Sequence, residues 1–186
     1  MTENIWQPSL ETQNIILRPM LESDYESMLL AASDPKIWEQ HPEKDRFKPE
    51  NFERFFKSGI NSQGAFSIID KKTSKIIGSS RFANYDAKQS KIEVGYTFLS
   101  CDHWGTGTNK EMKNAMVNYA FKFVGKIHFY IGELNTRSRR AVEKLGAIHL
   151  STETNKLHSG DAYQCCVYEL KRSIGLKPYP TNAMRQ

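Results

Sequence analysis

The stretch "HWGTGTNKEM", residues 103–112, holds two glycines separated by one threonine, directly before a run of residues with helical spacing. Apolar residues then recur three and four positions apart, which predicts an amphipathic helix over residues 110–125. Small residues in such a turn let several backbone N–H groups face one point, and the positive end of the helix dipole adds to their effect. The stretch therefore indicates an anion site, most simply for a phosphate, or else a plain tight turn.

The glycine pair fits neither of the two common nucleotide-binding motifs. A P-loop needs G-x-x-x-x-G-K-[ST], and a dinucleotide fingerprint needs a third glycine where Lys110 stands. Cations near a helix start oppose the helix dipole, yet Lys110 and Lys113 follow the turn. A shorter helix expected over residues 135–146 begins in the same way, with Arg137, Arg139 and Arg140. These cations favour a bound anion, although a solvated helix face would also carry them.

Length and composition suit one folded domain over residues 1–186. Of the 186 residues, 39% are hydrophobic and 25% are charged, which is ordinary for a globular protein. No run of about 18 apolar residues is present, and the first residues do not resemble a signal peptide. The three cysteines lack C-x-x-C spacing, and the five histidines show no metal-ligand spacing. We therefore expect a cytoplasmic protein with no metal site.

The basic charge of the chain is confined to its second half. Residues 1–100 carry 13 Lys and Arg against 14 Asp and Glu, a net charge of −1, whereas residues 101–186 carry 13 against 7, a net charge of +6. This asymmetry indicates an anionic partner for the second half. Nucleic acid is a poor candidate, because no recognition motif is present and aromatic residues are not interleaved with the basic ones. We expect neither nucleic acid nor a membrane as partner.

The order of expected elements predicts an α/β fold with a mixed central sheet and helices on its faces. The elements are a strand (14–20), a helix (21–32), a charged loop (33–49), a helix (49–60), a hairpin (65–70 and 75–85), a strand (90–100), the helix 110–125, a strand (126–132), the helix 135–146 and closing strands. Strict alternation in the strand 90–100 would place Glu93, Gly95 and Thr97 on one face, opposite Tyr96 and Phe98.

Two long segments resemble the GNAT superfamily of acyl-CoA-dependent N-acetyltransferases. They are "IEVGYTFLSCDHWGTGTNKEMKNAMVNYAF" (92–121) and "KIHFYIGELNTRSRRAVEKLGA" (126–147), and the opening "LETQNIILRPMLESDYESM" (10–28) is similar to the branch of the ribosomal-protein N-terminal acetyltransferases. The resemblance covers about residues 10–171 and leaves a tail, 172–186. It implies the GNAT fold, with about six to seven strands splayed in the middle of the sheet to admit acyl-CoA. The superfamily turn [QR]-G-x-G-x-[GA] corresponds to Trp104–Asn109; tryptophan at the first place is usual in this branch, and Asn109 at the last departs from the superfamily pattern.

The resemblance implies acetyl-CoA as the co-substrate of the protein. Its pyrophosphate would bind N–H groups of residues 105–110, its pantetheine arm would pair with backbone near Phe98 and Leu99, and Arg139 or Arg140 would meet its 3′-phosphate. The expected set of cofactor-binding residues is Phe98, Leu99, Trp104, Gly105, Thr106, Gly107, Thr108, Asn109, Lys110, Asn135, Ser138, Arg139 and Arg140.

The resemblance also implies direct attack of an amine on the thioester in a ternary complex. Glu93 is the expected base, provided that it is not simply a surface glutamate. Ser138, three residues after Asn135, would hydrogen-bond the leaving thiolate; alternatively, both residues only cap the helix. Trp38 and His41, in the loop 33–49, are expected to shape the acceptor pocket.

The expected function is transfer of an acetyl group from acetyl-CoA to a primary amine. The acceptor would be a protein N-terminus or a small molecule, and a homodimer is compatible with the resemblance. The alternative is a non-catalytic acyl-CoA-binding module. Val142 and Asn109 keep that alternative open, because many members of the superfamily carry a tyrosine at position 142 and Asn109 departs from the superfamily turn.

Overall fold

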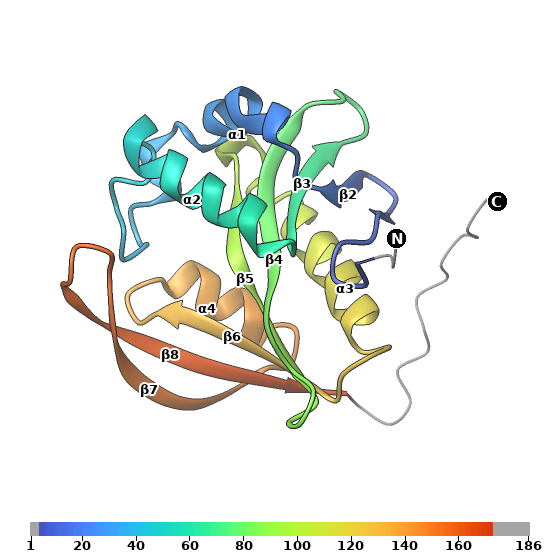
Figure 1. The fold of residues 1–186 in the computed structure, drawn as a ribbon, viewed down its shortest axis with the longest axis vertical. Helices are drawn as coiled ribbons and strands as arrows, with labels where there is room; N and C mark the ends of the chain where they lie inside the picture. Colours follow the sequence, from blue (N-terminus) through green and yellow to red (C-terminus); the bar gives the residue numbers. More distant parts are fainter. Residues whose placement is uncertain (1–3, 173–186) are drawn as a thin grey trace.

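The computed structural model describes residues 4–172 and is built on one eight-stranded mixed sheet (Figure 1). The strand order is β1-β2-β3-β4-β5-β6-β8-β7. The strands are β1 (Leu10–Glu11), β2 (Ile15–Pro19), β3 (Ala65–Asp70), β4 (Ile76–Asp86), β5 (Lys91–Leu99), β6 (Lys126–Gly132), β7 (Ile148–Lys156) and β8 (Ala162–Lys171). The α/β class is confirmed. The sheet has eight strands rather than six or seven, because the two-residue β1 adds to its edge beside β2. The expected tail, apart from Arg172, lies outside the described residues.

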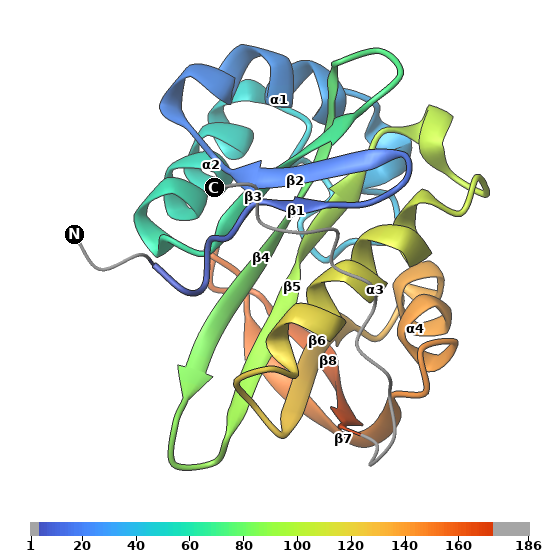
Figure 2. The same ribbon diagram turned by 90° about the vertical axis from the view of Figure 1, so that its right-hand side faces the viewer.

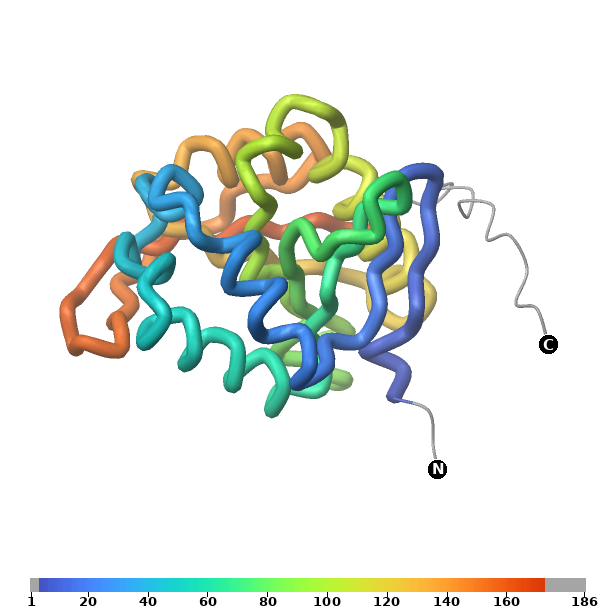
Figure 3. Tube along the Cα trace, turned by 90° about the horizontal axis from the view of Figure 1, so that it is seen from above, coloured from blue at the N-terminus to red at the C-terminus, as the bar shows by residue number. Residues whose placement is uncertain are grey.

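In the described part of the chain, four α-helices cover the two faces of the sheet (Figure 2). They are α1 (Tyr25–Ala32), α2 (Pro49–Ser62), α3 (Thr108–Ala120) and α4 (Thr136–Glu143). Figure 3 shows α2 and α4 on opposite sides of the sheet. Each layer has its own apolar cluster, one centred on α3 and the buried side of β5 and β6, and the other on α1 and α2. No helix within residues 4–172 has the length and apolar character needed to cross a bilayer.

Local sequence explains where the long helices begin and end. Helix α2 begins with Pro49, whose fixed φ suits a first helical position, and it buries Phe52, Phe55 and Phe56 as expected. Helix α3 begins at Thr108, directly after Gly107, and ends at Ala120, five residues before the expected end. The chain from Phe121 to Val124 continues in turns but still packs both of these residues into the core.

The sheet opens between β5 and β6, which within residues 4–172 are the one parallel pair of neighbouring strands. They pair only over Lys91–Glu93 with Lys126–His128. Beyond that point β5 continues against β4, while β6 continues against β8. The backbone of β5 from Val94 to Leu99 therefore has an edge that β6 does not occupy, which is the splayed arrangement that the resemblance implies.

A β-bulge in β5 changes which side chains share a face. Ser79 pairs with Phe98 and Arg81 with Gly95, so Tyr96 and Thr97 together oppose the single residue Ser80. Tyr96 has a positive φ of 53°, as an inserted bulge residue can. The expected strict alternation is therefore wrong beyond Gly95. Tyr96 and Phe98 lie on the side of α2, and Thr97 faces α3.

Candidate active site

The glycine turn before α3 is open and has left-handed backbone at both glycines. Gly105 has φ +74° and Gly107 has φ +90°, and a Cβ added to either would meet nothing within 4 Å. The backbone conformation therefore calls for glycine, and the space above the turn is free. The first N–H groups of α3 have no carbonyl partners within the helix. The geometry of the turn thus suits an anion that approaches the backbone closely.

Side chains of the turn stabilise its shape, and Thr106 Oγ1 also accepts the backbone N–H of Thr108 in a long hydrogen bond of 3.5 Å. Thr106 Oγ1 donates to the carbonyl of His103 at 2.9 Å and lies 2.8 Å from Thr108 Oγ1. Thr108 is buried, Asn109 is half-buried and Lys110 is exposed at the first turn of the helix. Among the lysines near the start of α3, Lys110 is therefore the one that a ligand at the turn could reach.

Trp104 joins the end of β5 to the start of α4. Its indole Nε1 donates to the carbonyl of Leu99 at 3.0 Å. The guanidinium of Arg137 lies 4.0 Å from the centre of its ring and also donates to the carbonyl of Ile37 at 3.1 Å. The carbonyl of Leu99 thus already has a partner, and the expected pairing of pantetheine with this part of β5 stays a prediction.

The first turn of α4 is capped by its own side chains. Asn135 Oδ1 accepts the backbone N–H of Ser138 at 3.1 Å, which confirms the expected cap. Arg139 donates from Nε to the hydroxyl of Tyr168 at 2.9 Å and from Nη1 to the carbonyl of Glu133 at 3.1 Å. The arginines at 137 and 139 therefore have protein partners, whereas Arg140 is exposed and open to an anion.

Glu93 is buried rather than a surface glutamate. It is 7% exposed, lies at the last paired position before β5 and β6 separate, and accepts from Asn84 Nδ2 at 2.6 Å. A Cβ at Gly95 would come within 2.8 Å of Glu93 Oε1, so the glycine there makes room for the carboxylate. Burial raises the pKa of Glu93, and the Asn84 hydrogen bond and the charges of Arg81 and Lys113 only partly offset it. A carboxylate with a raised pKa is a better base than an exposed one.

Aromatic and cationic side chains surround Glu93 on its face of the sheet. The guanidinium of Arg81 lies 4.2 Å from the ring centre of Tyr96, and it donates to Ser58 Oγ on α2 at 3.1 Å. Burial and the nearby charge of Glu93 raise the pKa values of Tyr96 and Tyr130, so both phenols are neutral near pH 7. Tyr96 and Tyr130 were missed from sequence, Tyr96 because of the bulge. Alternation with Phe129 and Ile131 could have found Tyr130.

The two residues expected to shape the acceptor pocket lie in the packed layer of α1 and α2. Trp38 is 2% exposed, donates from its indole to the carbonyl of Ala32 at 2.9 Å and packs against Phe98. His41 accepts the N–H of Glu43 at Nδ1, and burial together with the charge of Arg46 holds its pKa well below the usual value. His41 is therefore neutral, and a direct role of either residue toward an acceptor stays a prediction.

Lys113 does not join Lys110 at the helix start. It is 6% exposed, and its Nζ donates to Thr97 Oγ1 at 2.6 Å and lies 3.5 Å from Ser80 Oγ. Burial lowers its pKa to about 7, and the charge of Glu93 offsets only part of this effect. The sequence pattern grouped Lys113 with Lys110 as a cation beside an anion at the turn, or on a solvated helix face; the structure places it under the bulge of β5.

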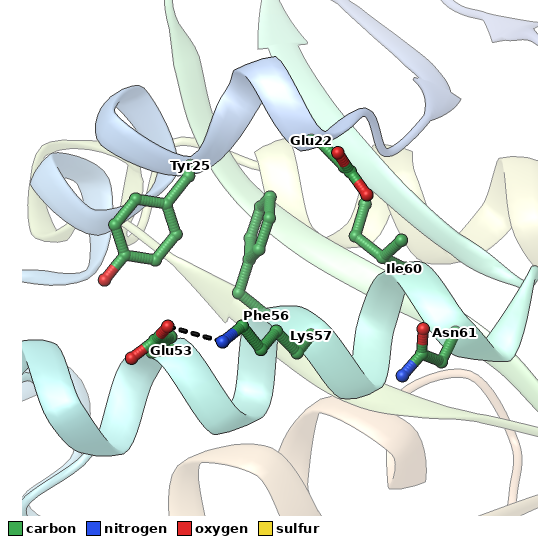
Figure 4. A pocket seen from close by; sticks show the side chains of 7 residues that line it. All are labelled: Glu22, Tyr25, Glu53, Phe56, Lys57, Ile60 and Asn61. Carbon is green, nitrogen blue, oxygen red and sulfur yellow. Dashed lines mark ion pairs between the residues drawn. The ribbon is translucent and has the colours of Figure 1, made fainter.

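A separate groove of about 450 Å³ lies between α1 and α2 (Figure 4). Its lining residues are Glu22, Tyr25, Glu53, Phe56, Lys57, Ile60 and Asn61. None of them belongs to β5, β6, α3 or α4, so the groove is distinct from the site around Glu93. Within residues 4–172, no group of three or more His, Cys, Asp or Glu side chains could hold a metal ion.

Comparison with known proteins identifies the family. The family model described as an acetyltransferase (GNAT) domain matches residues 14–148. The chain is 29% identical over 119 residues to the "uncharacterized N-acetyltransferase p20" of Bacillus licheniformis, a match that covers 61% of this chain and 66% of that protein. The chain therefore belongs to the GNAT acetyltransferase family.

Solved structures share the fold at low sequence identity. A GCN5-related N-acetyltransferase from Brucella melitensis has a TM-score of 0.78 at 17% identity, covering 89% of this chain and 79% of that one. Ribosomal-protein-S5-alanine acetyltransferase from Vibrio fischeri gives 0.66 at 18% identity, covering 89% and 97%. Spermidine N-acetyltransferase from Vibrio cholerae, solved with CoA and spermine, gives 0.67 at 14% identity, covering 86% and 96%.

Proposed function

We propose that this protein transfers an acetyl group from acetyl-CoA to a primary amine by direct attack in a ternary complex. The observation that carries the proposal is the position of Glu93, a buried carboxylate at the point where β5 and β6 separate. The free edge of β5 and the open glycine turn lie farther along the same strand and its connection to α3. One continuous path thus joins an anion site to a base.

The residues of the turn fit the pyrophosphate of acetyl-CoA. Gly105 and Gly107 leave room for the phosphates to approach the backbone, and the exposed Lys110 adds a cation. Arg140, exposed on α4, is the better candidate of the expected pair for the 3′-phosphate, because Arg139 already has partners. The pantetheine arm would then run along the free edge of β5 toward Glu93.

Glu93 supplies the proton acceptor that acyl transfer to an amine requires. An amine is protonated near pH 7, so it must lose one proton before attack and a second as the new C–N bond forms. Glu93 receives these protons in turn and releases them to solvent. The C–S bond breaks, and the thiolate that leaves takes up one proton. Ser138 and Asn135 are proposed to lie beside that sulfur, although a hydroxyl is a poor acid.

The charges around Glu93 favour an acceptor with a single amine over a polyamine. The two charged side chains that act most strongly on Glu93 are cations, Arg81 and Lys113. A second or third ammonium group near them would be repelled. A peptide N-terminus fits this environment, and the phenols of Tyr96 and Tyr130 can pack against a peptide chain and accept its hydrogen bonds.

One observation favours the alternative of a non-catalytic acyl-CoA-binding module. Val142, at the position where many members of the superfamily carry a tyrosine, is buried and has no proton to give. The two functions are separated by mass spectrometry of candidate acceptors incubated with acetyl-CoA and the protein. A gain of one acetyl group by Ser-, Ala- or Met-started peptides, amino acids, amino sugars or polyamines supports the enzyme and names its acceptor. Unchanged acceptors together with bound coenzyme A support the module.

A further inference from the structure

Lys113 is a buried amine that belongs to no ion pair within residues 4–172. Its Nζ contacts the hydroxyls of Thr97 and Ser80, and no ion pair in the part of the chain that the structure describes includes it. Burying an ammonium group without a carboxylate beside it is costly, and a methionine or leucine would fill the same space more cheaply. Stability therefore does not explain the presence of lysine at this position.

The amine lies where the sheet is open. Thr97, its closest partner, is on the part of β5 that has left β6. On the other side, Nζ is 5.9 Å from the ring centre of Phe129, the first residue of β6 beyond the paired segment. Lys113 thus spans the opening between the two strands from the side of α3.

The bulge places this amine and Glu93 on opposite faces of the same strand. Glu93 and Tyr96 are directed to the side of α2, whereas Thr97 is directed to Lys113 and α3. An extended arm that enters from the glycine turn and follows β5 passes Leu99 and then Thr97 before it reaches Glu93. A thioester in the opening would therefore have the base on one side and the lysine on the other.

We propose that Lys113 is the proton donor and electrostatic partner of the coenzyme A sulfur, an inference that rests on the proposed function. The acceptor amine attacks the carbonyl carbon from the side of Glu93, the C–S bond breaks, and the electron pair stays on sulfur. The Lys113 ammonium gives one proton to that sulfur and becomes a neutral amine. It recovers its proton from solvent before the next turnover.

This role supplies what Val142 and Ser138 do not. Val142 has no proton, and the hydroxyl of Ser138 is a weak acid. The pKa of Lys113, lowered by burial to about 7, brings its ammonium close in acidity to a thiol that has a cation beside it, so the proton can pass to the thiolate as the C–S bond breaks. Among the described charged groups, Glu93 is the one whose charge acts on Lys113.

The test is the thiol titration of bound coenzyme A, which needs no acceptor. The ultraviolet absorbance of the thiolate is followed against pH for coenzyme A bound to the wild-type chain, to Lys113→Met and to Lys122→Met. Lys122→Met is the control, because Lys122 is an exposed lysine beyond the end of α3. A cation within about 4–6 Å lowers the pKa of an acid by about 1–3. We expect a pKa lower by this amount on the wild-type chain and on Lys122→Met than on Lys113→Met.

An equal thiol pKa on all three proteins overturns the role of Lys113 and leaves the proposed function standing. Failure of the wild-type chain to bind coenzyme A overturns both. If Lys113→Met does not fold, as judged by circular dichroism, Lys113→Gln takes its place, because glutamine keeps a donor for Thr97 without the charge. The thiol pKa of coenzyme A is then expected to be higher on Lys113→Gln than on the wild-type chain.

Discussion

Replacing Lys113 by methionine is expected to stabilise the protein, and to do so more at low pH than at high pH. The methionine keeps the unbranched stem and removes the buried charge. The two hydroxyls that the amine contacts do not lose all partners, because Ser80 Oγ lies 2.8 Å from Thr97 Oγ1 and both reach the carbonyl of Gly95. The substitution therefore leaves no polar group without a partner, and the free energy of unfolding reports the cost of the buried amine.

The magnitude follows from the change in the pKa of the amine on folding. The pKa of Lys113 falls from 10.5 to about 7 because of burial. At about 1.4 kcal/mol per tenfold change in proton affinity, the folded state loses on the order of 5 kcal/mol at pH values below 7. Between about pH 7 and 10.5 the unfolded chain holds more protons than the folded chain, so stability rises with pH in this window. The loss is nearly absent above pH 10.5.

The assay is urea unfolding of the wild-type chain, Lys113→Met and the control Lys122→Met at several pH values. Between about pH 6.5 and 9.5, the advantage of Lys113→Met over the wild-type chain is expected to shrink by about 3 kcal/mol. Lys122 is exposed, so its substitution should change stability by less than about 0.5 kcal/mol at every pH. A Lys113→Met advantage that does not vary with pH would show that the amine is not buried as an uncompensated charge.

Three further substitutions test the remaining parts of the site. Glu93→Gln should lower kcat by about 10²–10⁴-fold in thiol-release kinetics without weakening coenzyme A binding, and an unchanged rate would remove Glu93 as the base. Because burial raises the pKa of Glu93, the wild-type rate should fall on the acid side at a higher pH than an ordinary glutamate would give. Gly107→Ala should lower the free energy of unfolding by about 1–2 kcal/mol, because alanine is strained at the φ of +90° that Gly107 adopts. The substitution should also raise the KM for acetyl-CoA, and an unchanged KM would argue against phosphate binding at the turn. Asn135→Ala removes the cap of α4 and should lower the free energy of thermal unfolding by about 1 kcal/mol. Ser138→Ala keeps the backbone N–H that Asn135 accepts, so its stability should not change. A fall in kcat in Ser138→Ala would then report the contribution of the Ser138 hydroxyl to catalysis.

Local patterns were sufficient to predict the fold class and most elements. Helical spacing located α2 and α3, the capping residue Asn135 located the start of α4, and alternation placed Glu93 opposite Val94; α3 begins at Thr108 rather than at the expected residue 110. These signals depend on neighbours within a few positions of the chain, so they can be read without the tertiary structure. The edge strand β1 was not predicted, because a strand of two residues is too short to show an alternating pattern.

The arrangement around Glu93 could not be predicted in full, because it depends on a shift in strand register. One inserted residue at the bulge moves Tyr96 to the side of Glu93 and turns Thr97 toward α3. A positive φ at a tyrosine has no signature in the sequence. Lys113 was assigned to the anion site or to a solvated helix face for a related reason, because nothing local in the sequence shows that its amine reaches a hydroxyl on β5.

The cations at the start of α4 illustrate a second limit of sequence reasoning. Their position against the helix dipole favoured an anion, yet Arg137 packs on Trp104 and Arg139 donates to Tyr168 and Glu133. Contacts with partners distant in the chain outweigh the modest cost of opposing the helix dipole. Only Arg140 keeps the exposure that the hypothesis of a bound anion needs.

Thiol release from acetyl-CoA, measured with the wild-type chain and with Glu93→Gln in the presence of peptides with free N-termini, decides whether this site is an acetyltransferase centre with Glu93 as its base. Coenzyme A affinity is measured in parallel for both proteins. We expect acceptor-dependent release by the wild-type chain, a loss of about 10²-fold or more in Glu93→Gln, and equal affinity for coenzyme A in both. Tight coenzyme A binding without release, for peptides and for small amines alike, would contradict the assignment of this site as an acetyltransferase centre.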